Sequence, residues 1–297
     1  MSTNLTLVIL AGGLGSRYGG IKQMDSVGPN DEAILDYSVY YAIQTGFNKV
    51  IFVLNKTIIS DFKTKYNNRF GNQIKTEFVI QDLTDIPSDF TIPDGRQKPW
   101  GTGHAVRSTR DMINEPFIVI NADDFYGRNA YMQTAIYLKH QKPNYAMYAY
   151  KLGNTLSEHG TVARGVCKVN DRNKLLSIVE NTSISRISEN QIRSDQNADL
   201  SDNTLVSMNF WAFTPDIFPI LEKAFNIFLN ENHLSLSAEF YIPTLIQYVI
   251  NNKIKDIDVL SGNAQWFGMT YKFDREETRQ SILKLIDNNI YPIKLWL

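Results

Sequence analysis

Residues 5–23 read LTLVILAGGLGSRYGGIKQ, and this stretch decides how the rest of the chain is interpreted. Its first part, residues 5–11, is a short, mainly apolar run, which is typical of a strand buried on both faces of a parallel sheet. The glycine-rich part that follows lets the backbone approach a ligand closely, and its successive N–H groups can surround an anion. Arg17 and Lys22 add positive charge. We therefore expect a phosphate-binding loop directly after the first strand.

Strands and helices alternate through the first half of the chain. This order predicts right-handed βαβ units and a Rossmann-like, doubly wound α/β sheet. Ligands of such sheets bind beyond the carboxyl ends of the strands, so the glycine loop and Asp123, which follows a later strand, are expected to meet in one crevice. The expected strands are 5–11, 49–54, 75–80 and 116–121, and the expected helices are 33–44, 58–69 and 102–112.

The second half is less regular, with a polar segment at 183–203 that is expected to form a loop. Neither a repeat of fixed period nor a clear linker is present, so we expect a single domain, 1–297, made of halves 1–125 and 126–297. The expected strands are 144–152, 162–169, 175–180 and 206–213, and the expected helices are 215–229, 238–250 and 276–287.

Composition narrows the class of protein. The net charge is −1, whereas a general nucleic-acid binder usually carries a basic excess. The one cysteine, Cys167, is expected to be a small buried residue, and a chain without possible disulfides fits a reducing, cytoplasmic compartment. The apolar run of residues 5–11 is far shorter than the ~20 residues of a membrane span. We expect no nucleic-acid or membrane partner.

Two familiar glycine motifs fail on spacing. A dinucleotide fingerprint requires G-x-G-x-x-G/A, but the last position after Gly13 and Gly15 is Tyr18. This mismatch disfavours a nicotinamide-dependent oxidoreductase. A Walker A loop requires lysine directly after its last glycine, where Ile21 stands.

Three segments together resemble the sugar-phosphate nucleotidylyltransferases, also called sugar-nucleotide pyrophosphorylases. They are L-A-G-G-x-G-x-R followed shortly by lysine at residues 10–22, PWGTGHA at 99–105, and NADD at 121–124. The second segment is similar to that of N-acetylglucosamine-1-phosphate uridylyltransferases. The resemblance implies a glycosyltransferase-A-like fold and Mg²⁺-dependent transfer of a nucleotidyl group from an NTP to a sugar 1-phosphate. UTP is the favoured donor and dTTP the second choice, and the halves 1–125 and 126–297 would bind nucleotide and sugar respectively.

The resemblance also implies roles for particular residues. Arg17, Lys22 and Asp123 would be catalytic, and Asp123 would hold Mg²⁺ with Glu239, because Pro243 replaces an aspartate that some branches carry in that late segment. A Gly-Thr-Gly loop at a helix start can offer backbone groups to a base edge, and the Gln81 amide can read the same base. His104 is expected to be structural. The nucleotide-binding residues would be Leu10, Ala11, Gly12, Gly13, Gly15, Gln81, Gly101 and Thr102, and the sugar-binding residues Gly160, Glu180 and Asn209.

Two alternatives remain open. The short insert between Arg17 and Lys22, and the Lys22-Gln23 pair, look more like cytidylyltransferases, which would give CTP and an acceptor such as phosphocholine or another alcohol phosphate. The chain could also be a catalytically silent nucleotide-sensing subunit, which the presence of Arg17, Lys22 and Asp123 disfavours. The sequence does not specify the sugar or the oligomeric state.

Overall fold

The computed structural model describes residues 4–13, 22–140, 143–157, 160–188, 191–196, 200–269 and 274–296. In the first half, the predicted alternation of strands and helices is confirmed. Helix α3 ends at Arg107, earlier than expected, because the Ser108 and Thr109 hydroxyls donate to the carbonyls of His104 and Val106 at the helix end. The elements are β1 (Thr6–Leu10), the 3₁₀ turn η1 (Lys22–Met24), α1 (Ile34–Gln44), β2 (Lys49–Leu54), α2 (Ile59–Tyr66), η2 (Gly71–Gln73), β3 (Lys75–Ile80), α3 (Thr102–Arg107) and β4 (Phe117–Asn121).

In the second half, α4 and β11 were not expected, and the expectation of a loop over 183–203 is wrong. Strand β8 runs on to Ser188 and pairs with β9, with Arg186 opposite Ile192. Ile184 and Ile192 are buried in the core, whereas Arg186, Ser188 and Gln191 are exposed. The elements are β5 (Asp124–Phe125), α4 (Gly127–Leu138), β6 (Tyr145–Lys151), η3 (Leu152–Asn154), β7 (Val162–Val169), β8 (Leu175–Ser188), β9 (Gln191–Arg193), β10 (Leu205–Phe213), α5 (Ile217–Asn232), α6 (Ile242–Asn251), β11 (Ile257–Ser261), β12 (Phe267–Gly268) and α7 (Asp274–Asp287).

Within the described residues, ten strands form one mixed sheet, with the order β3-β2-β1-β4-β10-β7-β8-β9 along its main path. Strands β3, β2, β1 and β4 are parallel, whereas β10 runs antiparallel to β4 and to β6. The order leaves β1 between β2 and β4, so the loops after β1 and β4 leave the same edge of the sheet. The predicted Rossmann-like α/β fold is confirmed.

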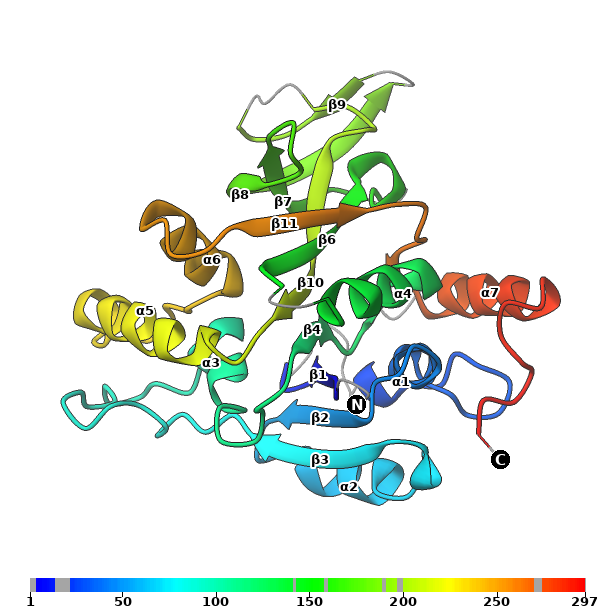
Figure 1. The fold of residues 1–297 in the computed structure, drawn as a ribbon, viewed down its shortest axis with the longest axis horizontal. Coiled ribbons are helices and arrows are strands. Elements are labelled where there is room, and N and C mark those ends of the chain that lie inside the picture. The colour runs from blue at the N-terminus through cyan, green and yellow to red at the C-terminus, as the bar shows by residue number, and fades with distance from the viewer. Residues whose placement is uncertain are drawn as a thin grey trace.

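Helices cover both faces of this sheet (Figure 1). In β1, Leu7 and Ile9 belong to the core layer of α1, α2, α4 and α7, and Val8 belongs to the layer of α3, α5 and α6. Both faces of the strand are buried, which explains its continuous apolar sequence. No helix in the described part of the chain is long and apolar enough to cross a membrane.

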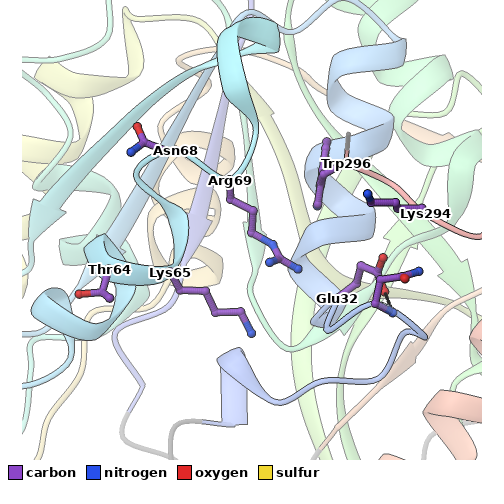
Figure 2. Close-up of a pocket in the computed structure, with 8 residues that line it drawn as sticks. Glu32, Thr64, Lys65, Asn68, Arg69, Lys294 and Trp296 are labelled. Carbon is purple, nitrogen blue, oxygen red and sulfur yellow. Dashed lines mark hydrogen bonds between the residues drawn. The ribbon is translucent and has the colours of Figure 1, made fainter.

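The C-terminal segment returns to the start of the fold. Trp296 Nε1 donates to the buried carboxylate of Asp36 at 2.9 Å, and Arg69 pairs with the same group. A hollow of about 390 Å³ lies beside this junction, and Lys65, Arg69 and Trp296 are among its lining residues (Figure 2). Two of the three cations in its lining, Lys65 and Arg69, pair with Asp31 and Asp36 and hold the junction together, and Lys294 is the third.

Candidate active site

A pocket of about 610 Å³ lies where the carboxyl ends of β1 and β4 meet the start of α3. It gathers eight of the residues predicted for the site, from five separate parts of the sequence. Four polar residues that the sequence analysis did not select also line it, namely Gln23, Gln97, Lys98 and Asn121. The predicted residues in its lining are Leu10, Gly12, Gly13, Gln81, Gly101, Thr102, Asp123 and Glu239.

The glycine loop leaves β1 at the centre of the sheet. Ala11 continues the strand, because its N–H donates to Val53 O at 2.9 Å. The next two carbonyls are held by side chains: Asn55 Nδ2 donates to Gly12 O at 2.9 Å, and Gln23 Nε2 donates to Gly13 O at 2.6 Å. These bonds fix both ends of the loop around the pocket.

The predicted loop residues Gly15 and Arg17 lie outside the described residues, and so does the side chain of Lys22. The backbone of Lys22 begins η1, two residues before Met24. Gln23, next to Lys22, lines the pocket. The described chain therefore lines the pocket again one residue after Lys22.

The loop of Gly101 and Gly103 owes its glycines to a close contact with the segment before α6. Phe240 N–H donates to Trp100 O at 2.7 Å, and Gly103 N–H donates to Phe240 O at 2.8 Å. A Cβ on Gly101 would lie 2.7 Å from Phe240 O, and one on Gly103 would lie 2.6 Å from Phe240 Cδ1. Only glycine permits this approach, which also brings Glu239 to the pocket rim.

Arg96 holds the same two segments together through its side chain. It is 5% exposed, and its guanidinium donates to four backbone carbonyls on both sides of the junction. Burial lowers the pKa of Arg96, and the nearby Glu239 opposes that shift. The acceptors are the carbonyls of Lys98, Pro99, Ser235 and Ala238.

The two carboxylates after β4 have different surroundings. Asp123 lines the pocket. Asp124 Oδ2 accepts from Asn121 Nδ2 at 2.9 Å and from Tyr126 OH at 3.2 Å. Burial, and then the charge of Asp123, raise the pKa of Asp124. Asp124 thus organises the strand end, while Asp123 is the one of the two that lines the pocket.

The pocket suits a hard cation that takes several of its ligands from water molecules or from substrate phosphates. Mg²⁺ is usually bound by one or two carboxylates together with substrate phosphates. Asp123 and Glu239 are the acidic residues in the described lining, and Glu239 Oε2 already contacts Lys98 Nζ at 2.7 Å and Tyr241 OH at 2.6 Å. No group of three or more His, Cys, Asp or Glu side chains suitable for a metal occurs among the described residues.

The predicted sugar-side residues are placed less uniformly. Asn209 Nδ2 donates to Asn121 Oδ1 at 2.7 Å, and Trp211 Nε1 donates to Asn209 Oδ1 at 2.9 Å, so Asn209 supports a residue of the lining. Glu180 is exposed on β8, and Gly160 precedes β7. Neither belongs to the lining of the 610 Å³ pocket.

Arg164 is a functional candidate that the sequence analysis missed. It lies on β7 opposite Asn181, and its guanidinium carbon is 4.9 Å from the centroid of the Trp266 ring. Burial lowers the pKa of Arg164, while the charges of Asp124 and Glu180 oppose this shift. The pairing of β7 with β8, which brings Arg164 under the influence of the Glu180 charge, joins distant segments and leaves no local pattern in the sequence.

Comparisons with known proteins agree with this arrangement. The family model described as nucleotidyl transferase matches residues 6–263. The inositol-1-phosphate CTP transferase from T. maritima has a similar structure, with a TM-score of 0.65 at 14% identity, covering 95% of this chain and 97% of that one. UDP-glucose pyrophosphorylase, solved with UDP-glucose, gives a TM-score of 0.62 at 19% identity, covering 95% and 99%.

A third similar structure is a putative glucose-1-phosphate thymidylyltransferase from Bacillus anthracis, with a TM-score of 0.62 at 14% identity, covering 93% of this chain and 94% of that one. At these identities the likenesses show the fold. No curated protein matches the chain.

Proposed function

Since this chain belongs to the nucleotidyl transferase family, and is a nucleotidyltransferase, we propose that it joins an NTP to a sugar 1-phosphate and releases pyrophosphate. UTP is the favoured donor, and dTTP is the second choice. One observation supports this proposal most strongly. Gly12 and Gly13 at the start of the glycine loop, Gln81, Gly101 with Thr102, and Asp123 come from distant parts of the chain and line a single pocket.

The proposed reaction needs no general base. A sugar 1-phosphate already carries an anionic oxygen, which attacks the α-phosphorus in line as the bond to the bridging oxygen of pyrophosphate breaks. Catalysis then depends on positioning and on neutralising charge. Backbone N–H groups of the glycine loop are suited to the triphosphate, with Arg17 and Lys22 as the proposed cations.

Asp123 is the proposed ligand of Mg²⁺, with Glu239 as a candidate second ligand. When bound, the ion would neutralise phosphate charge next to the α-phosphorus. Lys98 holds Glu239 by an ion pair at 2.7 Å, so Glu239 has to exchange one contact to reach a metal. Asp123 is therefore the carboxylate on which the proposed metal site depends.

Arg164 is the proposed partner of the acceptor phosphate. The resemblance to thymidylyl-type members implies a phosphate-binding lysine at the position after the glutamate that matches Glu180, where this chain has Asn181. Arg164 lies directly opposite Asn181 in the β7–β8 ladder, so it can supply the cation from the neighbouring strand. Its planar fork suits a phosphate, although the guanidinium already donates to Thr155 and to Ala163 O, so it has to exchange one of these bonds to bind one. Glu180 and Asn209 are the proposed contacts of the sugar.

A second candidate is a cytidylyltransferase that acts on phosphocholine or another alcohol phosphate. The short insert between Arg17 and Lys22 favours it, and one of the similar folds is a transferase of CTP to inositol 1-phosphate. The chemistry at the α-phosphorus is the same, so the two proposals differ in the base and in the acceptor.

A substrate panel tests these proposals. The purified protein with Mg²⁺ is incubated with each of UTP, dTTP, CTP, ATP and GTP, paired with hexose 1-phosphates, inositol 1-phosphate or phosphocholine, while pyrophosphate release is followed. We expect release that requires both substrates, with UTP or dTTP and a sugar phosphate. Release only with CTP and an alcohol phosphate would select the second candidate. Nucleotide binding without release in any pair would favour the silent subunit.

A further inference from the structure

The side-chain amide of Gln81 is held by its nitrogen. Nε2 donates to Gly101 O at 2.9 Å and lies 3.3 Å from His104 Nδ1. The carbonyl of Gly101 can only accept, so it fixes which end of the amide is the nitrogen. The remaining atom, Oε1, lies toward the glycine loop, 3.6 Å from where a Cβ on Gly12 would be. Gln81 therefore presents an acceptor to the pocket.

His104 is the second group that fixes this orientation. Its Nε2 lies 2.8 Å from Asp85 O, an acceptor, so Nε2 carries the hydrogen and Nδ1 is free to accept from Gln81. The His104 side chain is fully buried, and burial lowers its pKa to about 4, with the charge of Arg107 acting in the same direction. His104 is therefore neutral near pH 7, in the tautomer that accepts from Gln81.

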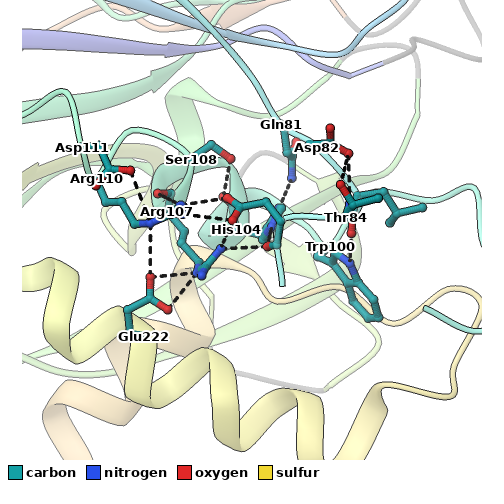
Figure 3. A network of polar contacts seen from close by, with 12 residues as sticks. Gln81, Asp82, Thr84, Trp100, His104, Arg107, Ser108, Arg110, Asp111 and Glu222 are labelled. Carbon is teal, nitrogen blue, oxygen red and sulfur yellow. Dashed lines mark hydrogen bonds and ion pairs between the residues drawn. The ribbon is translucent and has the colours of Figure 1, made fainter. Parts of the chain in front are cut away.

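The carbonyl that holds His104 is itself held in place. Arg107 Nη1 donates to Asp85 O at 2.8 Å, and the Asp85 carboxylate contacts Arg110 Nη1 at 2.8 Å. Arg107 Nε reaches Glu222 on α5 at 2.9 Å. Figure 3 shows this continuous set of contacts from Glu222 to Gln81. The arrangement gives Gln81 one orientation rather than two.

We propose, on the basis of the nucleotidyl transfer proposed above, that His104 is a positioning residue which makes Gln81 select a base with a ring N–H. Uracil and thymine carry this donor at N3, whereas the ring nitrogen of cytosine at that position is an acceptor. If cytosine bound in the same way, its ring nitrogen and Gln81 Oε1 would both be acceptors, and no hydrogen bond could form between them. A site built to bind a donor discriminates strongly against an analogue that lacks it, because a buried polar group is left unpaired.

The test compares UTP, CTP and N3-methyl-UTP with the wild-type enzyme and with His104→Phe. Phenylalanine keeps the ring that packs 5.2 Å from Phe225, and Asp85 O keeps its bond to Arg107. We expect the wild type to prefer UTP over both analogues. In His104→Phe we expect both preferences to shrink on the order of 10-fold, mainly through KM for the nucleotide, because Gln81 loses one of its two fixing partners.

Ser108→Ala is the matched control. Ser108 Oγ donates to His104 O at 3.1 Å on the same helix turn, whereas the Gln81 amide nitrogen is held by Gly101 O and His104 Nδ1. This variant should keep the wild-type preference. If His104→Phe does not fold, His104→Leu provides the same comparison, and Gln81→Leu tests separately whether the Gln81 acceptor reads the base.

The outcomes separate this inference from the proposed function. If no nucleotide supports pyrophosphate release, the proposed function fails, and calorimetric binding of UTP, CTP and N3-methyl-UTP still measures the preference. If the variants keep an unchanged preference for UTP over N3-methyl-UTP, or the wild type has none, the role of His104 is overturned.

Discussion

The guanidinium carbon of Arg96 lies 3.4 Å from the centroid of the Trp100 ring. Trp100 is fully buried beside Phe225 and Phe228, and its Nε1 donates to Leu83 O at 3.1 Å. Trp100 is thus held in place, and its ring positions the guanidinium of Arg96. The guanidinium then donates to backbone carbonyls of two loops, at residues 98–99 and 235–238. The pocket residues on these loops are far from each other in sequence, so Arg96 determines their relative position.

The first prediction is that Arg96→Lys weakens nucleotide binding as well as the fold. Lysine keeps the charge but loses the planar fork, so several carbonyls lose their donor. We expect KM for the NTP to rise about 5- to 10-fold, and the free energy of unfolding to fall by about 2–3 kcal/mol. Steady-state kinetics and urea denaturation measure both. The control is Arg172→Lys, at an exposed turn, and an unaltered KM in Arg96→Lys would show that the loops hold their position without this residue.

The second prediction concerns the proposed catalytic groups. Lys22→Ala and Asp123→Ala should each lower the rate by ~10²–10³, the usual effect of removing a group that stabilises developing charge, while the fold is kept. Asp124→Ala is the informative contrast. Asp124 is hydrogen-bonded to Asn121 and Tyr126, so its loss should lower the melting temperature first. Near-normal turnover in Lys22→Ala or Asp123→Ala would count against the assignment.

The third prediction is a pH dependence of stability. His104 has a folded pKa of about 4 against 6.5 for the free side chain, so between these values the unfolded chain binds more protons. Its contribution is fully present above pH 6.5 and is lost as the pH falls toward 4. The shift corresponds to about 3 kcal/mol.

Denaturant unfolding of the wild type and of His104→Phe at pH 7.5, 6, 5 and 4 measures this contribution. Other carboxyl groups titrate in both proteins, so the difference between the two curves reports His104. We expect the wild type to lose about 3 kcal/mol more than the variant between pH 7.5 and 4. Parallel curves would contradict a neutral, buried His104.

The sequence predicts the parts of this molecule whose signals are local. A continuous apolar run identifies β1, and spacing identifies the first four strands and three helices, because burial on both faces and turn residues leave direct traces. The glycine loop and Asp123 both follow strand ends, so their meeting in one crevice could be predicted, and Gly12, Gly13 and Asp123 do line one pocket. The likeness of the Gly101 loop to the N-acetylglucosamine-1-phosphate uridylyltransferases stays a prediction.

Contacts that join distant segments could not be predicted in this way. Ile184 and Ile192 are buried residues of the segment 183–203, and most of the residues around them are polar. The composition therefore predicted a loop rather than two paired strands. Gly101 and Gly103 are required by contact with Phe240, which no local pattern indicates. His104 was expected to be structural, and its link to Gln81 depends on the position of Asp85.

The last prediction is that Arg164 discriminates between the two substrates. Its side chain lies over Trp266 and is attracted by Asp124 and Glu180, on the β7–β8 side of the proposed reaction centre. Arg164→Met keeps much of the bulk and removes the charge. We expect KM for the sugar phosphate to rise about 10-fold while KM for the NTP stays within about 2-fold, because a charge-assisted contact to phosphate contributes about 1.5–3 kcal/mol. Lys168→Met, an exposed cation on the same strand, is the matched control and should change neither constant. An equal rise in both KM values would assign Arg164 to the fold of β7 rather than to the acceptor, and no rise in either would move the acceptor phosphate elsewhere in the pocket.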